Sequence, residues 1–228
     1  MIYGSNQRIK RKDSISLFCN GSPLTESESF KYLGIVIDQH LNFNNHIEHV
    51  VNKVSRKLGV FRRLRISLTM AAAERIYKTM IVPIFDYCDV AWHGCGKLNS
   101  DTLESLQHRA AKIIFPNSGL HTKELIAALG LVPLTNRRRL HIVSLTRKCL
   151  DGLVPPYLNN YFNLNISVHT VATRRCNDIH IPKVNLEVAK RSFYFTGATE
   201  FNSLPRQIKT KESSSEFLRL SKDFFLLP

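Results

Sequence analysis

The chain has 228 residues, of which 43% are hydrophobic, and this fraction excludes a wholly disordered protein and allows one or two domains. Its 32 Lys and Arg residues outnumber 18 Asp and Glu residues, which gives a formal net charge of +14. That excess favours a polyanionic partner, either nucleic acid or an anionic membrane surface, over a basic surface that is merely solvated. No apolar run is long enough to span a bilayer, so we expect no transmembrane segment.

The cysteines and the N-terminus indicate an intracellular setting. The five cysteines are scattered and none forms the short Cys-x-x-Cys spacing of a zinc or redox centre, so we expect reduced thiols. The first residues lack the apolar core of a signal peptide. We therefore expect an intracellular protein, in the nucleus or the cytoplasm.

Extended structure is predicted near the N-terminus. Residues 30–38 form a β-branched and aromatic run that predicts a strand, and Gly34 within it predicts a bulge or the close approach of another backbone. A second apolar run, residues 15–19, precedes it, and the turn-forming residues 20–23 follow that run. Asn20-Gly21 between the two apolar runs is the strongest short hairpin signal. Residues 1–4 resemble the last part of another strand.

A strong amphipathic helix is predicted next, with Asn45 as N-cap and Glu48 completing a capping box. Its apolar stripe consists of Ile47, Val50, Val51, Val54, Leu58 and Phe61. The opposite face carries Asn52, Arg56, Gly59 and Arg63, flanked by Lys53 and Arg62. This face is either a solvated surface or a phosphate-facing ridge. A glycine inside a helix costs about 1 kcal/mol relative to alanine, which would be tolerated where a ligand approaches the backbone.

Further helices follow in the basic central region. A helix capped by Thr69 is expected to kink at Pro83, and others are predicted over residues 100–115, 122–129 (ending at Gly130) and 135–151 (ending at Gly152). The last of these begins with Arg137, Arg138 and Arg139, whose charges oppose the helix dipole. That conflict favours an external anion as their partner.

The pattern changes again from about residue 169. Short extended segments are predicted at 173–175, 179–182 and 191–195, followed by a turn at 202–205. A final amphipathic helix carries Phe217, Leu220 and Phe224. The whole chain thus predicts an α+β protein that is predominantly α-helical.

No autonomous catalytic or metal centre is predicted. Asp86 and Asp89 lie at i, i+3 in an otherwise apolar helical stretch, and we expect them to cap or to pair with a Lys or Arg. His46 and His49 share the same spacing, but no third ligand lies near them in sequence. The chain has neither a phosphate-binding glycine loop nor a Gly-x-Ser-x-Gly elbow.

Several separated motifs, in the right order along nearly the whole chain, resemble the reverse transcriptases of non-LTR (LINE-type) retrotransposons, in their jockey-like branch. They are Phe30-Lys31-Tyr32-Leu33-Gly34-Ile35 with Asp38, Leu41-Asn42-Phe43, Lys53-Val54-Ser55-Arg56-Lys57-Leu58, Ile84-Phe85-Asp86-Tyr87-Cys88 with Trp92, Leu106-Gln107-His108-Arg109-Ala110-Ala111-Lys112-Ile113-Ile114, Arg191-Ser192-Phe193, Gly197 and Phe201-Asn202-Ser203-Leu204-Pro205. The family commonly has Trp where Phe201 stands, which is a conservative departure.

The resemblance implies a division into the end of a palm with a primer-grip hairpin (1–40), a helical thumb (41–118), a helical connection (119–165) and a mixed C-terminal region (166–228). It implies that the primer terminus is touched by Lys31, Tyr32, Leu33 and Gly34. It implies that the thumb contacts an RNA–DNA or RNA duplex, in a manner blind to sequence, through Lys53, Arg56, Lys57, Arg62 and Arg63.

The family's catalytic aspartate pair lies upstream of the strand to which residues 1–4 correspond. We therefore expect a C-terminal fragment that is inactive alone, with no cofactor of its own, because Mg²⁺ would be bound by palm residues outside it. Expected partners are the duplex and the palm and fingers of the same polymerase, with no membrane. The alternatives are a basic helical protein-interaction module without dedicated nucleic-acid binding, and an independent enzyme.

Overall fold

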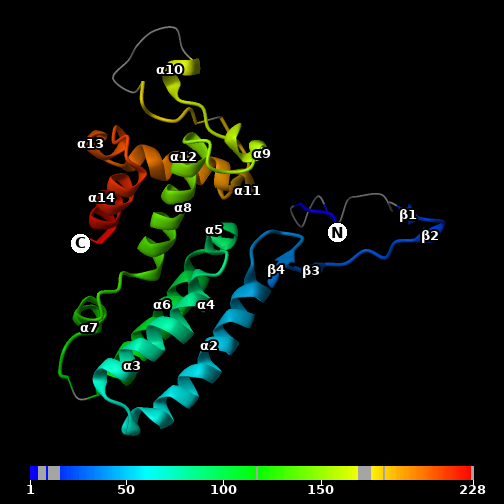
Figure 1. Ribbon diagram of the computed structural model, residues 1–228. Helices are drawn as coiled ribbons and strands as arrows, with labels where there is room; N and C mark the ends of the chain where they lie inside the picture. The colour runs from blue at the N-terminus through cyan, green and yellow to red at the C-terminus, as the bar shows by residue number, and fades with distance from the viewer. Residues whose placement is uncertain (5–8, 10–15, 117, 169–175, 182, 227–228) are drawn as a thin grey trace.

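The computed structural model describes residues 1–4, 9, 16–116, 118–168, 176–181 and 183–226. These residues form a helical body from which the N-terminal hairpins project to one side (Figure 1). The strands of the described residues form two separate two-stranded antiparallel sheets, so the predicted α+β, predominantly helical class is confirmed. Within the described residues no helix is both long and apolar enough to cross a bilayer.

The first hairpin has the predicted Asn-Gly turn, but the strand after that turn is residues 22–23 and not the predicted run at 30–38. Strands β1 (Phe18–Cys19) and β2 (Ser22–Pro23) pair antiparallel, and Asn20 and Gly21 between them have φ values of 49° and 77°. Positive φ at both central residues is the geometry that an Asn-Gly hairpin turn requires. The predicted strand end at residues 1–4 was wrong, because this segment has no strand assignment and is tied instead by Gly4, whose N–H donates to the Gln39 carbonyl at 3.0 Å.

The single strand predicted over residues 30–38 was also wrong, because this stretch is a hairpin in itself. Strands β3 (Ser29–Tyr32) and β4 (Ile35–Asp38) pair antiparallel, with Tyr32 opposite Ile35. Leu33 and Gly34 form the turn, with φ values of 45° and 85°. Gly34 is therefore a turn residue and not a bulge.

The loop after β4 is organised by a buried carboxylate. Asp38 accepts hydrogen bonds from the backbone N–H groups of His40 at 2.9 Å, Asn42 at 3.3 Å and Phe43 at 2.7 Å. These contacts hold Leu41 and Phe43 in the left-handed region, at φ 52° and 59°. The chain thereby turns sharply from the hairpin into the first long helix.

Helix α2 (Asn44–Leu64) buries the predicted stripe, with Val51 the one member that stays half-exposed. The predicted Asn45 cap was wrong, because the N-cap is Phe43, two residues earlier, and it makes no side-chain capping bond. Asp38 takes over part of that task by accepting the Phe43 N–H. The 3₁₀ turn η1 (Arg65–Ser67) ends this segment.

The predicted second helix is broken into shorter pieces around Pro83. Thr69 caps α3 as predicted, accepting a hydrogen bond from the Ala72 N–H at 3.3 Å. The pieces are α3 (Met70–Ile76), the π-helical η2 (Tyr77–Ile81), α4 (Val82–Asp86) and α5 (Asp89–Trp92). The π-helical turn ends two residues before Pro83, where the missing N–H and the proline ring disrupt the helical hydrogen bonds of the preceding turn.

Helix α6 (Lys97–Ile114) closes the first hydrophobic core by packing on α2. The largest buried side chains of this core are Tyr77, Phe85 and Trp92. Helix α7 (Thr122–Ala128) then ends as predicted at Gly130, with φ 62°, and the Leu131 N–H donates back to the Ile126 carbonyl at 3.1 Å.

Helix α8 (Leu134–Leu150) belongs to both cores. Leu134 packs into the first core, whereas Val143 and Cys149 pack into a second one built by the C-terminal helices. Those helices are α9 (Pro156–Asn159), α10 (Asn165–Val168), α11 (Glu187–Lys190), α12 (Phe193–Ser203), α13 (Arg206–Lys209) and α14 (Ser214–Leu226). The domain boundaries predicted from the sequence stay predictions.

The predictions for the C-terminal region met different outcomes. The extended segment at 191–195 was wrong, because Ser192 caps α12 by accepting the Phe195 N–H at 3.4 Å. Of residues 179–182, Ile179 forms one bridge with Leu164, while residues 173–175 and 182 lie outside the described residues. The predicted final helix is present as α14.

Helix α12 packs tightly on α8 because it has a glycine at the contact. A Cβ at Gly197 would lie 2.6 Å from Thr146 Oγ1.

Candidate nucleic-acid interface

The β3–β4 turn is fixed from a distant helix. The Tyr87 hydroxyl, just after α4, donates a hydrogen bond of 2.7 Å to the Leu33 carbonyl. The same ring lies against Gly34, where an added Cβ would be 3.3 Å from Tyr87 Cε1. Gly34 is thus needed twice, for its positive φ and for the space that the tyrosine ring takes.

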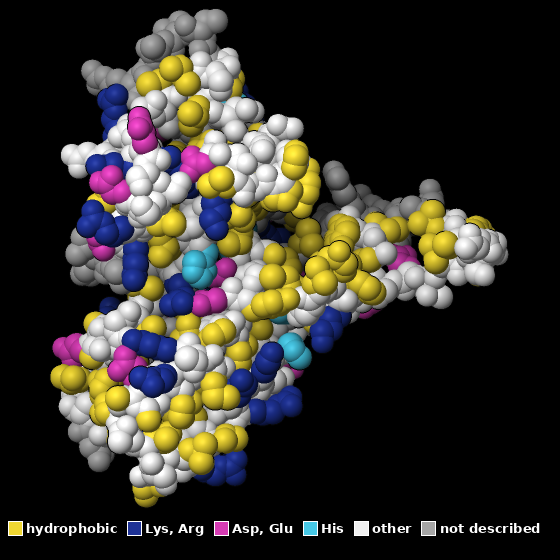
Figure 2. Space-filling model, in the orientation of Figure 1, with side chains coloured by type: hydrophobic (Ala, Val, Ile, Leu, Met, Phe, Trp, Pro, Cys, Tyr) yellow, Lys and Arg dark blue, Asp and Glu magenta, His cyan; other side chains and the backbone are white. Residues whose placement is uncertain are grey.

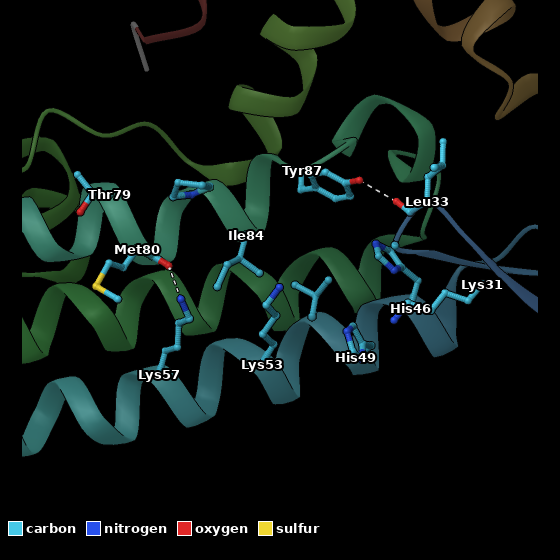
Figure 3. A pocket seen from close by; sticks show the side chains of 13 residues that line it. Lys31, Leu33, His46, His49, Lys53, Lys57, Thr79, Met80, Ile84 and Tyr87 are labelled. Carbon is cyan, nitrogen blue, oxygen red and sulfur yellow. Dashed lines mark hydrogen bonds between the residues drawn. The ribbon is translucent and has the colours of Figure 1, made fainter.

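This turn forms one end of a groove of about 600 Å³ that we call the lysine groove. Its walls come from the hairpin, from α2 and from the η2–α4 segment (Figure 3). It is lined by Lys31, Leu33, Gly34, His46, His49, Val50, Lys53, Lys57, Thr79, Met80, Pro83, Ile84 and Tyr87. The structure therefore brings together five of the nine predicted contact residues, from segments about twenty residues apart.

The charged groups of the lysine groove are all basic. Lys31, Lys53 and Lys57 supply ammonium groups, and none of the described lining residues is acidic. Lys57 is held in place because its Nζ donates to the Met80 carbonyl at 3.1 Å, within the π-helical turn (Figure 3). On the face of the molecule that Figure 2 shows, Lys and Arg side chains continue along α2.

His46 lies at the inner wall of the lysine groove as a neutral side chain. Burial lowers its pKa, and the neighbouring His49 lowers it further. Its Nδ1 accepts the Val36 N–H at 3.4 Å, which leaves Nε2 as the protonated nitrogen. Nε2 has no hydrogen-bond partner among the described residues. His46 therefore anchors β4 to α2 and adds a buried donor to this wall.

Four predicted contact residues lie outside the lysine groove. Tyr32 is 58% exposed on the hairpin and Arg63 is exposed on the outer face of α2. Arg56 borders a neighbouring apolar groove, and Arg62 lies in a different groove beside α6. The predicted basic face of α2 is thus divided, because 3.6 residues per turn spread these cations around more than half of the helix.

Sequence reasoning did not assign a role to Tyr87, His46, His49 or the Met80 carbonyl. Tyr87 belongs to one of the motifs that resemble the family, residues 84–88, and no other sequence feature indicated a role for this residue. The two histidines were weighed only as metal ligands, although their spacing equally places both on one face of a helix. The Met80 carbonyl contacts Lys57 from within a π-helical turn, and no local sequence pattern predicted that turn.

Asp86 pairs with an arginine of α8, as predicted, whereas the partner of Asp89 is a histidine of the same helix. The Arg137 guanidinium binds both oxygens of Asp86 at 2.6 Å, and His141 Nδ1 lies 2.6 Å from Asp89. Hydrogen bonding to Asp89 raises the pKa of His141. Donor atoms of Asp86, Asp89 and His141 lie within 4.8 Å of one another, but a bidentate arginine occupies the position where a cation would bind. The group does not fit a metal ion.

The external anion expected for the three arginines was wrong, because each has a partner within the chain. Arg137 binds Asp86, and Arg139 binds Glu200 at 2.8 Å. Arg138 is buried, donates to the Ser100 hydroxyl and lies 5.5 Å over the Trp92 ring. These contacts tie α8 to the first core and to α12.

Three curated proteins are similar to part of this chain, which confirms the resemblance. They are a probable RNA-directed DNA polymerase from transposon BS of Drosophila melanogaster (28% identical over 97 residues), one from transposon X-element of the same species (22% over 109 residues) and the RNA-directed DNA polymerase from mobile element jockey of Drosophila funebris (24% over 106 residues). The matches cover 41% to 46% of this chain but only 11% to 12% of the relatives. No protein-family model and no solved structure matches.

Proposed function

We propose that this chain is the primer-grip and thumb region of a retrotransposon RNA-directed DNA polymerase, and that it binds template–primer duplex, either RNA–DNA or RNA, in the lysine groove. The observation that carries the proposal is the convergence of Lys31 and the Leu33-Gly34 turn with Lys53 and Lys57. The partial similarity to three such polymerases supports the same assignment.

The chemistry of the lysine groove suits a nucleic-acid backbone. Ammonium groups without acidic neighbours attract phosphates, and such contacts position a duplex without reading its sequence. Leu33 is 73% exposed at the tip of the hairpin, so its turn can meet the end of a strand while Tyr87 holds it from behind.

The direct test is binding of a labelled RNA–DNA hybrid to the double variant Lys53→Gln/Lys57→Gln. The matched control is Lys148→Gln/Lys222→Gln, which removes the same charge from exposed positions on α8 and α14. We expect affinity to fall at least tenfold for the groove variant and less than twofold for the control. Equal losses in both variants would show that net charge alone drives binding and would refute the groove.

A second candidate function is a helical protein-interaction module. It is favoured by an apolar groove of about 300 Å³ between α2 and η2, in which Val60, Leu64 and Met80 are roughly half-exposed. Reversing the charge of Lys31 and Lys53, which line the lysine groove and not the apolar groove, separates the two functions. Duplex affinity falls while the fold survives if the lysine groove binds nucleic acid, and it is unchanged if this side of α2 binds only protein.

A further inference from the structure

A second basic groove lies on the other flank of α2. It has a volume of about 720 Å³ and is built by the C-terminal ends of α2 and α6, whereas the lysine groove lies between α2 and α4. It is lined by Arg62, Arg65, Ile66, Arg109, Lys112, Ile113 and Pro116. We call it the arginine groove. Four of these seven described residues are cations and none is acidic.

The cations of the arginine groove differ in how they are held. Arg65 is fixed, because its guanidinium donates to the Ile114 carbonyl at 3.1 and 2.9 Å and to the Leu68 carbonyl at 2.8 Å. Arg62, Arg109 and Lys112 are exposed and form no ion pair or hydrogen bond with a described residue through their side chains. One cation is thus rigid and three are available to a ligand.

The four cations of the arginine groove are not explained by favourable interactions with the C-terminal ends of the α2 and α6 dipoles. Cations near a helix C-terminus are stabilising, and Lys112 and Arg62 lie in the last turns of α6 and α2. However, Arg65 already contacts the last carbonyl of α6, and Arg109 lies more than a turn before that end. Four converging positive charges without a carboxylate repel one another, and a polyanion would relieve that repulsion.

We propose that the arginine groove binds the phosphodiester backbone of a second nucleic-acid segment, single-stranded and separate from the duplex in the lysine groove. The inference rests on the nucleic-acid binding proposed above. The buried stripe of α2 separates the two grooves, so a short duplex placed in one does not occupy the other. Ile66, which is 93% exposed, and Pro116 give this groove an apolar lip that unpaired bases can cover.

The test uses the double variant Arg109→Gln/Lys112→Gln, which leaves the structural Arg65 intact. Its matched control is Arg219→Gln/Lys222→Gln on α14, because it removes one Arg and one Lys at the same i, i+3 spacing. The probe is a labelled single-stranded oligonucleotide of about ten nucleotides, titrated with and without a saturating blunt RNA–DNA hybrid. Thermal unfolding of each variant checks that the fold is retained.

Wild-type protein should bind the oligonucleotide while the hybrid is bound. The Arg109/Lys112 variant should bind it at least tenfold more weakly, with a salt slope lower by about 1.4, because each phosphate contact on a single strand contributes roughly 0.7. Its affinity for the hybrid should change less than twofold. The Lys53/Lys57 variant should bind the hybrid at least tenfold more weakly and the oligonucleotide with less than a twofold change. The α14 control should change neither affinity by more than twofold.

Two results would overturn the inference. One is an Arg109/Lys112 variant that binds the oligonucleotide like wild type. The other is displacement of the oligonucleotide by the hybrid, since a single continuous surface would then serve both ligands. Failure of the lysine groove is a separate result, because it is read from the effect of the Lys53/Lys57 variant on the hybrid alone.

Discussion

The Tyr87 hydroxyl donates to the Leu33 carbonyl across 54 positions of sequence, and this bond fixes the β3–β4 turn above α2. It joins the hairpin to the segment that contains the π-helical turn and Pro83. Without it, the turn would be held to the helical body mainly by the packing of β4 on α2. The position of Lys31 relative to Lys53 and Lys57 therefore depends on Tyr87.

Replacing Tyr87 by phenylalanine removes this bond and keeps the ring. We expect a loss of about 0.5 kcal/mol in the free energy of unfolding, at the low end for a hydrogen bond because Tyr87 is half-exposed. Hybrid affinity should fall several-fold, as the turn is no longer held in position. Denaturant unfolding and hybrid titration measure the two effects, with Tyr157→Phe as a control at a 70% exposed tyrosine. Equal hybrid affinity in the variant and the wild type would contradict the positioning role.

Two glycine substitutions should have opposite effects on stability. Gly34→Ala should destabilise the protein by about 1–2 kcal/mol, because φ is +85° and the new Cβ meets the Tyr87 ring. Gly59→Ala should stabilise it by about 0.5–1 kcal/mol, because Gly59 lies inside α2 and a Cβ there meets nothing within 4 Å. Thermal unfolding of both variants measures this contrast. A hybrid-affinity loss in the more stable Gly59→Ala protein would show that nucleic acid approaches that part of α2.

The loop between β4 and α2 should depend on the charge of Asp38. Asp38→Asn replaces one acceptor oxygen by a donor facing backbone N–H groups, so we expect a loss of about 1–3 kcal/mol in the free energy of unfolding. The control is Asp223→Asn, at an exposed position on α14. An Asp38 variant as stable as that control would show that the loop conformation does not depend on this carboxylate.

Stability should depend on pH through His141. Its pKa is raised above the ordinary 6.5 by hydrogen bonding to Asp89, so the ion pair stabilises the fold fully below pH 6.5 and is lost as pH rises through the raised value. Burial lowers the pKa values of His46 and His93, so their protonation destabilises the fold at low pH. In the difference in unfolding free energy between the wild type and His141→Gln, the contributions of His46 and His93 cancel because both proteins contain them. The stability difference should be larger at pH 5.5 than at pH 8.5, and the opposite order would show that the pair does not act as an ion pair.

Local signals predicted the elements whose geometry is set by neighbours in sequence. The α2 stripe, the Thr69 cap and the Asn20-Gly21 turn needed only periodicity, a hydroxyl and a glycine at the right positions. The β3–β4 turn could not be predicted in this way, because leucine rarely adopts positive φ and the stabilising Tyr87 lies far along the chain. A strand was the natural interpretation of such a β-branched run.

The candidate site was predictable in part for the same reason. Lys31, Lys53 and Lys57 were identified from the motifs, but their convergence depends on the hairpin geometry. The arginines of α8 were misassigned because their partners Asp86 and Glu200 lie 51 and 61 residues away. Basic residues near a helix N-terminus predict that an anion pairs with them, but they do not indicate whether the chain itself supplies that anion.

The salt dependence of hybrid binding decides whether the lysine groove binds phosphate. The logarithm of the binding constant should fall linearly with the logarithm of salt concentration, and Lys53→Gln/Lys57→Gln should lower the slope by about 1.8, since each duplex phosphate contact contributes roughly 0.9. The Lys148→Gln/Lys222→Gln control should keep the wild-type slope. A flat salt response in the wild-type protein, or an unchanged slope in the Lys53/Lys57 variant, would contradict a phosphate-binding lysine groove.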